Sequence, residues 1–371
     1  MGVSGPAPGG AWPEPIADGF ECVAGEAAPR PSALPGPQHG EGAPGVSGSG
    51  GPGCDVLRWD FDVLACGLAN PLLVVGREVF SRSRLSHDLG LADEPLTRFL
   101  TAVEGRYDDA CPYHCAAHAA DVLAAASYLA SRAQRQLPSP LAPHELLALF
   151  LAALGHDVGH FALNAAYLRN SGHEIASRYD AKGSPLERYH LEVLDGLVRS
   201  EGLLEATNLG EEEKAEVGSL VEEMVLATDM ARHDSYMERL GAWGEAVRRG
   251  ERQTPARAGC PRRLALCALM KAADLANVYR PLGVSAKWGA RILDEMVAQG
   301  KKEASEGLPV TTYREHVPLA EHQLSFLARV TPLLGMLAEF HLDSSTAQTL
   351  LRHIAENGEA WSEAGATVAA R

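Results

Sequence analysis

From about Val56 onward, the apolar residues of this chain recur at helical intervals. The alternation of β-branched residues that is typical of strands is scarce over the same stretch. We therefore expect an all-α fold, with one compact multi-helix domain over residues 55–371. Helical segments are predicted at 72–83, 94–103, 111–135, 143–155, 185–201, 211–231, 233–248, 261–276, 286–299, 320–341 and 345–363.

The first 54 residues have a different composition. They are so rich in Gly and Pro that they offer little material for a packed core. We predict that residues 1–54 form a disordered tail or linker. Order should begin where Trp59, Phe61, Val63 and Leu64 bring the first apolar density.

The overall charge limits the choice of ligand. The formal net charge is −15, and no cluster of Lys and Arg could follow a phosphate backbone. These features argue against nucleic-acid binding. An anionic substrate would also be repelled, unless cations in the site reversed the local field.

Cysteine usage and hydropathy indicate the compartment. The seven cysteines are odd in number and lack the spacing of a disulfide framework, which favours a reducing environment. The N-terminus does not resemble a signal or transit peptide. The longest apolar run, 146–155, is too short to span a membrane. We expect a soluble, cytoplasmic protein without membrane insertion, and the sequence sets no oligomeric state.

Two pairs of histidines are spaced four residues apart. His114 and His118 fall on the predicted helix 111–135, and His156 and His160 fall at the end of another. On a helix this spacing places both imidazoles of a pair on one face. A single pair of this kind is often only structural, but two pairs with accompanying carboxylates indicate a metal site.

Two aspartates supply those carboxylates. Asp157 directly follows His156 after an apolar helix, which would present both side chains at a cleft. Asp274 ends the apolar run 264–270, where an unpaired buried carboxylate would be costly without a cation. Imidazole and carboxylate ligands without thiolate suit Zn, Mn, Fe or Mg. The order His, His-Asp, Asp resembles that of the HD phosphohydrolase superfamily.

The likeness extends to a narrower family. Over nearly all of residues 57–363 the sequence resembles the catalytic domain of class I cyclic nucleotide phosphodiesterases. The matching stretches, in family order, are YHCAAHAADV (113–122), HDVGHFALN (156–164), SPLERYH (184–190), LATDMARH (226–233), KAADLANVYRPL (271–282), WGARILDEMVAQG (288–300) and QLSFLARVTPL (323–333).

The resemblance implies a two-metal centre. The tighter ion, usually zinc, would be held by His118, His156, Asp157 and Asp274. Asp157 would also reach a second ion, usually magnesium and alternatively manganese. The waters of that ion would be oriented by His160, Glu187 and Thr228, with outer support from His190, Asp229 and His233. Two such ions suit an in-line phosphoryl displacement.

The resemblance also implies a proton donor and a slot for the base. His114, which is not a metal ligand in this scheme, would protonate the departing O3′ as general acid. Gln323 would pair with the purine edge through its amide. The purine would lie between Phe326 and Ile292, and the pocket would be completed by Tyr113, Asn277 and Met230. We expect three further residues of this region to belong to the scaffold: Trp288, Arg291 and Glu295.

The implied substrate is a 3′,5′-cyclic nucleotide, opened to the 5′-monophosphate. The stretch 277–299 and the Gly-Leu-Pro-Val at 307–310 look nearest to cAMP-selective members, which favours cAMP over cGMP. The chain departs from the family pattern at Cys115, Gly159, Phe161-Ala162 and Val278. None of these positions is an implied metal ligand, but they affect the expected shape of the metal-water shell and the rate.

Three other interpretations are open at this point. Another HD hydrolase, such as a nucleotidase or triphosphohydrolase, would have no reason to keep Gln323 followed by Phe326. A degenerate cyclic-nucleotide sensor would keep the pocket without the chemistry, which the complete ligand set and His114 argue against. A purely structural helical protein would leave Asp157 and Asp274 without explanation.

Overall fold

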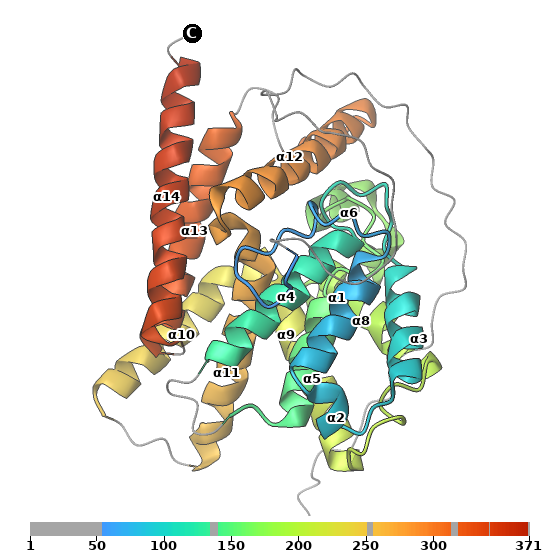
Figure 1. The fold of residues 1–371 in the computed structure, drawn as a ribbon. Helices are drawn as coiled ribbons and strands as arrows, with labels where there is room; N and C mark the ends of the chain where they lie inside the picture. Colours follow the sequence, from blue (N-terminus) through green and yellow to red (C-terminus); the bar gives the residue numbers. More distant parts are fainter. Residues whose placement is uncertain (1–53, 134–139, 251–254, 313–317, 341, 370–371) are drawn as a thin grey trace, which may run out of the picture. The chain divides into compact units, whose positions relative to one another are not determined.

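A computed structural model describes residues 54–133, 140–250, 255–312, 318–340 and 342–369 (Figure 1). All regular elements in these residues are helical. The α-helices are α1 (Pro71–Arg82), α2 (Leu85–Asp88), α3 (Asp93–Glu104), α4 (Ala116–Arg132), α5 (Pro143–Gly155), α6 (Ala165–Ser171), α7 (Glu174–Tyr179), α8 (Pro185–Ser200), α9 (Glu211–Thr228), α10 (His233–Arg248), α11 (Pro255–Asp274), α12 (Leu282–Ser305), α13 (Leu319–Phe340) and α14 (Ser344–Ala369). Short 3₁₀ helices are η1 (Asp180–Lys182), η2 (Met230–Arg232) and η3 (Leu275–Tyr279).

The all-α prediction is confirmed, and each predicted helix is present with ends that differ by a few residues. Three short helices, α2, α6 and α7, were not predicted, because helices of four to seven residues are too short for a helical period to show. Apart from Cys54, the predicted tail 1–54 lies outside the described residues.

The centre of the domain is built from α4, α5, α9 and α11. α5 packs against α9 and α4, and α11 packs against α9 and α4. The run from Leu147 to Gly155 is buried throughout. A helix that is apolar on every side has to be enclosed by other helices, which explains why α5 lies in the middle.

The C-terminal helices α12, α13 and α14 form a second group beside this centre, with α13 and α14 lying side by side (Figure 1). Asn357 of α14 ties the group to η3. Its side-chain amide donates to the carbonyl oxygens of Val278 and Arg280, both at 2.9 Å. The last helix therefore fixes the turn that directly follows Asp274.

A buried ion pair joins α4 to the same turn. Arg280, fully buried, donates to the Asp121 carboxylate at 2.7 Å and to the carbonyl of Trp59 at 2.8 Å. The Trp59 indole in turn donates to the carbonyl of Tyr279. Both terminal nitrogens of Arg280 are thus hydrogen-bonded, which offsets part of the cost of burying the charge, while its Nε has no partner among the described residues. This network holds α4, which carries His118, against the turn after Asp274.

The cysteines correct one expectation. Cys54 and Cys66 form a disulfide, with Cα atoms 5.8 Å apart, a pairing that the expectation of a reducing environment did not include. The sequence could not show it because the pairing depends on how the segment between them folds back. Cys111, Cys115 and Cys267 are buried. Across the described residues, no helix combines the length and the apolarity that crossing a membrane requires.

Candidate metal centre and base slot

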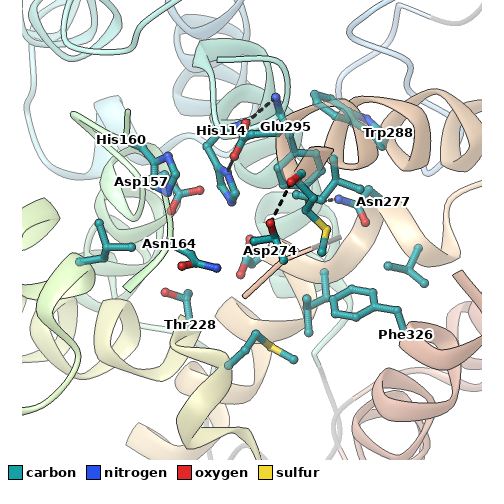
Figure 2. A pocket seen from close by; sticks show the side chains of 18 of the residues that line it. His114, Asp157, His160, Asn164, Thr228, Asp274, Asn277, Trp288, Glu295 and Phe326 are labelled. Carbon is teal, nitrogen blue, oxygen red and sulfur yellow. Dashed lines mark hydrogen bonds and ion pairs between the residues drawn. The ribbon is translucent and has the colours of Figure 1, made fainter. Parts of the chain in front are cut away.

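Three helices of the central group end at the wall of one cavity of about 410 Å³ (Figure 2). α9 ends at Thr228 and α11 ends at Asp274, while Asp157 follows the end of α5, and all three residues line the cavity. The C-terminus of a helix carries a partial negative charge. With two carboxylates added, this wall of the cavity favours cations.

The metal ligands implied by the sequence lie together. The ligand atoms of His118, His156 and Asp274 are all within 4.8 Å of one another. His118 Nε2 is 3.3 Å from Asp274 Oδ1 and 3.7 Å from Asp157 Oδ2. Both histidines are buried beneath the two carboxylates, which face the cavity.

The tautomer of His156 shows why this cluster fits a metal ion. His156 Nδ1 lies 3.1 Å from the carbonyl of Ala153, which can only accept, so Nδ1 carries a proton. In a neutral ring Nε2 then has only a lone pair, yet it lies 3.1 and 3.2 Å from oxygens of Asp157 and Asp274. No hydrogen bond to a described residue satisfies this atom. Three electron-rich atoms converge there, and a divalent cation would satisfy them together.

The pKa shifts express the same electrostatics. Burial alone would lower the pKa of His156, but the charges of Asp157 and Asp274 raise it well above the usual value of an imidazole. Burial would raise the pKa of Asp157, yet His156 and His114 hold it well below the usual range. The pKa of Asp274 is lowered by His156 and His118 against the same effect of burial. The two carboxylates therefore favour positive charge at this cluster.

His114 belongs to a neighbouring cluster of different character. Its Nδ1 is bonded to Glu295, and the other oxygen of Glu295 accepts from the backbone N–H groups of Tyr113 and His114, at 3.0 and 3.1 Å (Figure 2). Because the bonded Nδ1 faces Glu295, Nε2 is the nitrogen that can meet a ligand in the cavity. His160 stacks on His114 with ring centroids 4.1 Å apart.

This contact corrects the assignment of Glu295 to the scaffold. Burial would lower the pKa of His114, but the charge of Asp157 and the bond to Glu295 raise it. Burial would raise the pKa of Glu295, but the bond to His114 brings it down to about 2. Glu295 therefore orients the His114 ring and favours its charged form. The sequence carried no sign of this, since the partners are 181 residues apart.

Most of the residues expected around the second ion also line the cavity. His160 accepts from the N–H of Ala162 through Nδ1, so Nε2 is its donor. His190 donates through Nδ1 to Val158 and lies 4.0 Å from Asp157, with its pKa lowered to about 4 by burial. The remaining members that line it are Glu187, Thr228 and Asp229.

Two residues beside this group complete its surroundings. His233 is buried and does not line the cavity, so its outer-support role stays a prediction. Burial and the nearby positive charge of Lys271 lower the pKa of His233. The Ser184 hydroxyl donates to the Asp229 carboxylate at 2.7 Å. Burial and the charge of Asp229 raise the pKa of Glu187 to about 8.

The six residues expected to form the base slot line the same cavity: Tyr113, Met230, Asn277, Ile292, Gln323 and Phe326. Figure 2 shows Phe326 across the cavity from Asp157. Tyr113 lies at the other end, with its ring centroid 4.5 Å from that of His118, and its hydroxyl accepts from the amide of Asn277. The structure thus brings the expected slot residues and the carboxylates into one cavity.

Several lining residues were not singled out by the sequence. They are Asn164, Met296, Gln299, Thr312 and His322. Gln299 accepts from the backbone N–H of Asn164 and donates to Glu303, which joins α12 to the loop before α6. Asn164, Met296 and Gln299 lie within stretches that match the family, but the sequence does not show that they face the cavity.

Three of the four paired histidines lie outside the helices on which they were predicted. α4 begins at Ala116, and His114 lies in the turn before it. α5 ends at Gly155, so His156 and His160 also lie outside a helix. The helical-face argument for both pairs is therefore wrong. The backbone donors at 113 and 114 go to Glu295, which keeps this turn out of α4.

The departures from the family pattern lie around the centre. Cys115 is the N-cap of α4, and Arg291 donates to its sulfur at 3.9 Å. Gly159 has φ of 78°, and Ala162, where the family usually has Gly, has φ of 59°. Ala162 therefore occupies a left-handed conformation that is unfavourable for a residue with a side chain. The carbonyl of Val278 accepts from Asn357.

An all-helical domain that gathers imidazoles and carboxylates at converging helix ends is typical of a metal-dependent phosphohydrolase. Comparison with known families agrees: the model of the 3′,5′-cyclic nucleotide phosphodiesterase family matches residues 113–354, and the chain belongs to this family.

Individual relatives give the same result. The chain is 33% identical over 265 residues to the probable 3′,5′-cyclic phosphodiesterase pde-6 of Caenorhabditis elegans, covering 68% of this chain and 33% of that protein. It is 29% identical over 288 residues to the human high affinity cAMP-specific and IBMX-insensitive 3′,5′-cyclic phosphodiesterase 8A, covering 72% and 34%. The chain therefore spans about a third of the length of these relatives.

The fold has a close counterpart among solved structures. The phosphodiesterase domain of the RhoPDE fusion protein from the choanoflagellate Salpingoeca rosetta superposes with a TM-score of 0.75 at 26% identity. The match covers 85% of this chain and 98% of that domain.

Proposed function

We propose that this protein hydrolyses a 3′,5′-cyclic nucleotide to the 5′-monophosphate, with cAMP favoured over cGMP. The observation that carries the proposal is the arrangement of one cavity. One wall holds converging acceptors without enough donors, and the other is an apolar slot with an amide, Gln323. A nucleotide has matching parts, an anionic phosphate and a flat base with a polar edge.

The phosphate end depends on two divalent ions, zinc and magnesium, with manganese as the alternative for the second. His118, His156, Asp157 and Asp274 would hold the first, and Asp157 would be shared with the second. When bound, such ions activate water and neutralise charge on the phosphate. The Nε2 donor of His160 and the groups on Glu187 and Thr228 face the same space and would orient waters there.

His114 would supply the proton that the reaction needs. Opening the ring at the 3′ ester leaves an alkoxide oxygen on the ribose, which must take a proton as it departs. Glu295 holds Nδ1 of His114, so a proton on Nε2 can pass to that oxygen. The bond to Glu295 raises the pKa of His114, which favours the proton-donating form.

The base end would select purines. Ile292 and Phe326 can contact the two faces of a planar ring, and the Gln323 amide offers both a donor and an acceptor to its edge. Support for cAMP comes from the human relative, whose name describes it as cAMP-specific. Such an activity would end a second-messenger signal, for which we expect a cytoplasmic location.

A direct assay tests the proposal. Purified protein would be stripped of metal with a chelator, reloaded with zinc and magnesium, and assayed with cAMP and cGMP separately. We expect hydrolysis only after reloading, 5′-AMP as product, and a higher kcat/KM for cAMP. Hydrolysis of nucleoside monophosphates or triphosphates but of neither cyclic nucleotide would contradict the proposal and favour another phosphohydrolase activity.

A further inference from the structure

One glycine of α12 lies directly against the amide of Gln323. A Cβ atom added to Gly289 would be 3.0 Å from Gln323 Nε2 and 3.2 Å from Cδ, both closer than ordinary van der Waals contact. Gly289 lines the cavity between Trp288 and Ile292, and Gln323 reaches it from α13. Only the absence of a side chain at 289 lets the amide approach the α12 backbone this closely.

The backbone itself does not need glycine at this position. Gly289 lies inside a regular helix and is not among the residues with positive φ. In a helix interior glycine is less favourable than alanine, because it loses more conformational freedom on folding. The reason for glycine at 289 therefore lies in the neighbouring side chain.

Gly289 differs from the other helical glycines in the kind of side chain that lies against it. A Cβ at Gly76 would meet Leu100 at 2.7 Å, and a Cβ at Gly155 would meet Leu194 at 2.5 Å. Those two glycines serve close packing against apolar side chains. Gly283, in the same helix as Gly289, has nothing within 4 Å of an added Cβ. At Gly289 the approaching group is polar and lines a ligand cavity.

The Gln323 amide is open to a ligand. The residue is 4% exposed and lines the cavity, and no hydrogen bond joins its side chain to a described residue. Its amide atoms are not among the buried polar atoms that lack a partner, so they face the cavity. Gly289 thus lies against one side of the amide, and the cavity leaves the other side to a ligand.

We infer that Gly289 is a specificity-determining residue, which sets the position and the rotation of the Gln323 amide toward the base. The inference rests on the proposed function, in which the amide meets a purine edge. Adenine and guanine present different donors and acceptors, so the amide must turn differently for each. A side chain at 289 would press on the end of a flexible group, which moves at little cost to folding. A side chain at 289 should therefore affect recognition of the base more than folding.

The variant Gly289→Ala tests this, with Gly283→Ala as the matched control in α12. Each protein would be assayed with cAMP, cGMP and the purine-free diester bis(para-nitrophenyl) phosphate, and its thermal midpoint measured. For Gly289→Ala we expect KM for the preferred nucleotide to rise about 2- to 13-fold, the worth of one net hydrogen bond. The ratio of kcat/KM between the two nucleotides should change as well. Hydrolysis of the purine-free diester and the thermal midpoint should not fall.

The outcomes separate the inference from the proposed function. Gly289→Ala behaving like Gly283→Ala toward both cyclic nucleotides would overturn the inference while the function stands. Equal losses on all three substrates would also overturn it, since the damage would then be general. A wild-type protein that cleaves only the purine-free diester would overturn the proposed function, and the inference with it.

Discussion

Two clusters of the same composition lie next to each other in this protein. The first contains His118, His156 and Asp274, and the second contains His114, His160 and Glu295. Each has two imidazoles and a carboxylate whose ligand atoms lie within 4.8 Å. Residue type alone would assign a metal to both.

The supply of donors distinguishes them. Glu295 accepts from two backbone N–H groups and from the ring of His114, so both of its oxygens have donors. In the first cluster the Nε2 atom of His156 faces two carboxylates, and in the neutral ring the only proton is on Nδ1 and faces a carbonyl. One cluster is satisfied by protons and the other needs a cation. The comparison teaches that a metal site is recognised by unmatched acceptors as well as by ligand type.

The largest effect that tests this difference between the clusters is expected from the carboxylates around the first cluster. Asp157→Ala or Asp274→Ala should reduce kcat/KM by more than about 10³-fold, because the ions that activate water are lost. Metal analysis of the purified variants should show a corresponding loss of zinc. Full metal content together with wild-type activity in either variant would remove the metal assignment.

The second cluster should respond in the opposite way to loss of its main histidine. His114→Ala should keep its metal, while kcat falls about 10²- to 10⁴-fold, the usual contribution of a positioned acid. A substrate with a leaving group that needs no proton should recover much of this loss. Loss of metal in His114→Ala would show instead that the second cluster is also a ligand set.

The base slot provides a test that should affect neither cluster. Gln323→Ala leaves polar atoms of the purine unpaired, which costs about 1–3 kcal/mol and should raise KM roughly 5- to 150-fold. Metal content and the hydrolysis of a purine-free diester should be unchanged. Equal damage to both substrates would place Gln323 in the scaffold.

The smallest effect sharpens the role of Glu295. Because Glu295 raises the pKa of His114, Glu295→Gln should lower that pKa. His114 would then lose its proton at a lower pH, so the alkaline limb of the kcat profile should move to lower pH. At the optimum, kcat should fall about 10-fold, as for other residues that orient a functional side chain.

The control for this variant is Glu303→Gln. Glu303 is a buried glutamate of the same helix, bonded to Thr311 and Gln299 and not to His114. Its pH profile should match that of the wild type. An unshifted profile in Glu295→Gln would mean that Glu295 does not tune the acid.

The sequence was most informative where the signal is local. Apolar spacing located α5 and α11. The candidate metal ligands His156 and Asp157 directly follow α5, and Asp274 is the last residue of α11. Contacts between residues whose pairing depends on the tertiary fold could not be predicted from the sequence. Glu295 meets His114 across 181 positions, and Cys54 meets Cys66 through a fold of the intervening segment. The spacing of apolar residues along the chain contains no information about such contacts.

The two hydrogen bonds from Asn357 affect which fragments of this protein would keep the turn after Asp274 in place. The match to the family ends at 354, yet the amide that holds the carbonyls of Val278 and Arg280 comes from just beyond it. At the other end Trp59, which bonds Arg280 and Tyr279, precedes the match by a wide margin. A fragment trimmed to the family boundaries would keep all the metal ligands but lose both outer supports of the turn after Asp274. We therefore expect that a fragment in which this turn is fully supported has to extend beyond residues 113–354 at both ends.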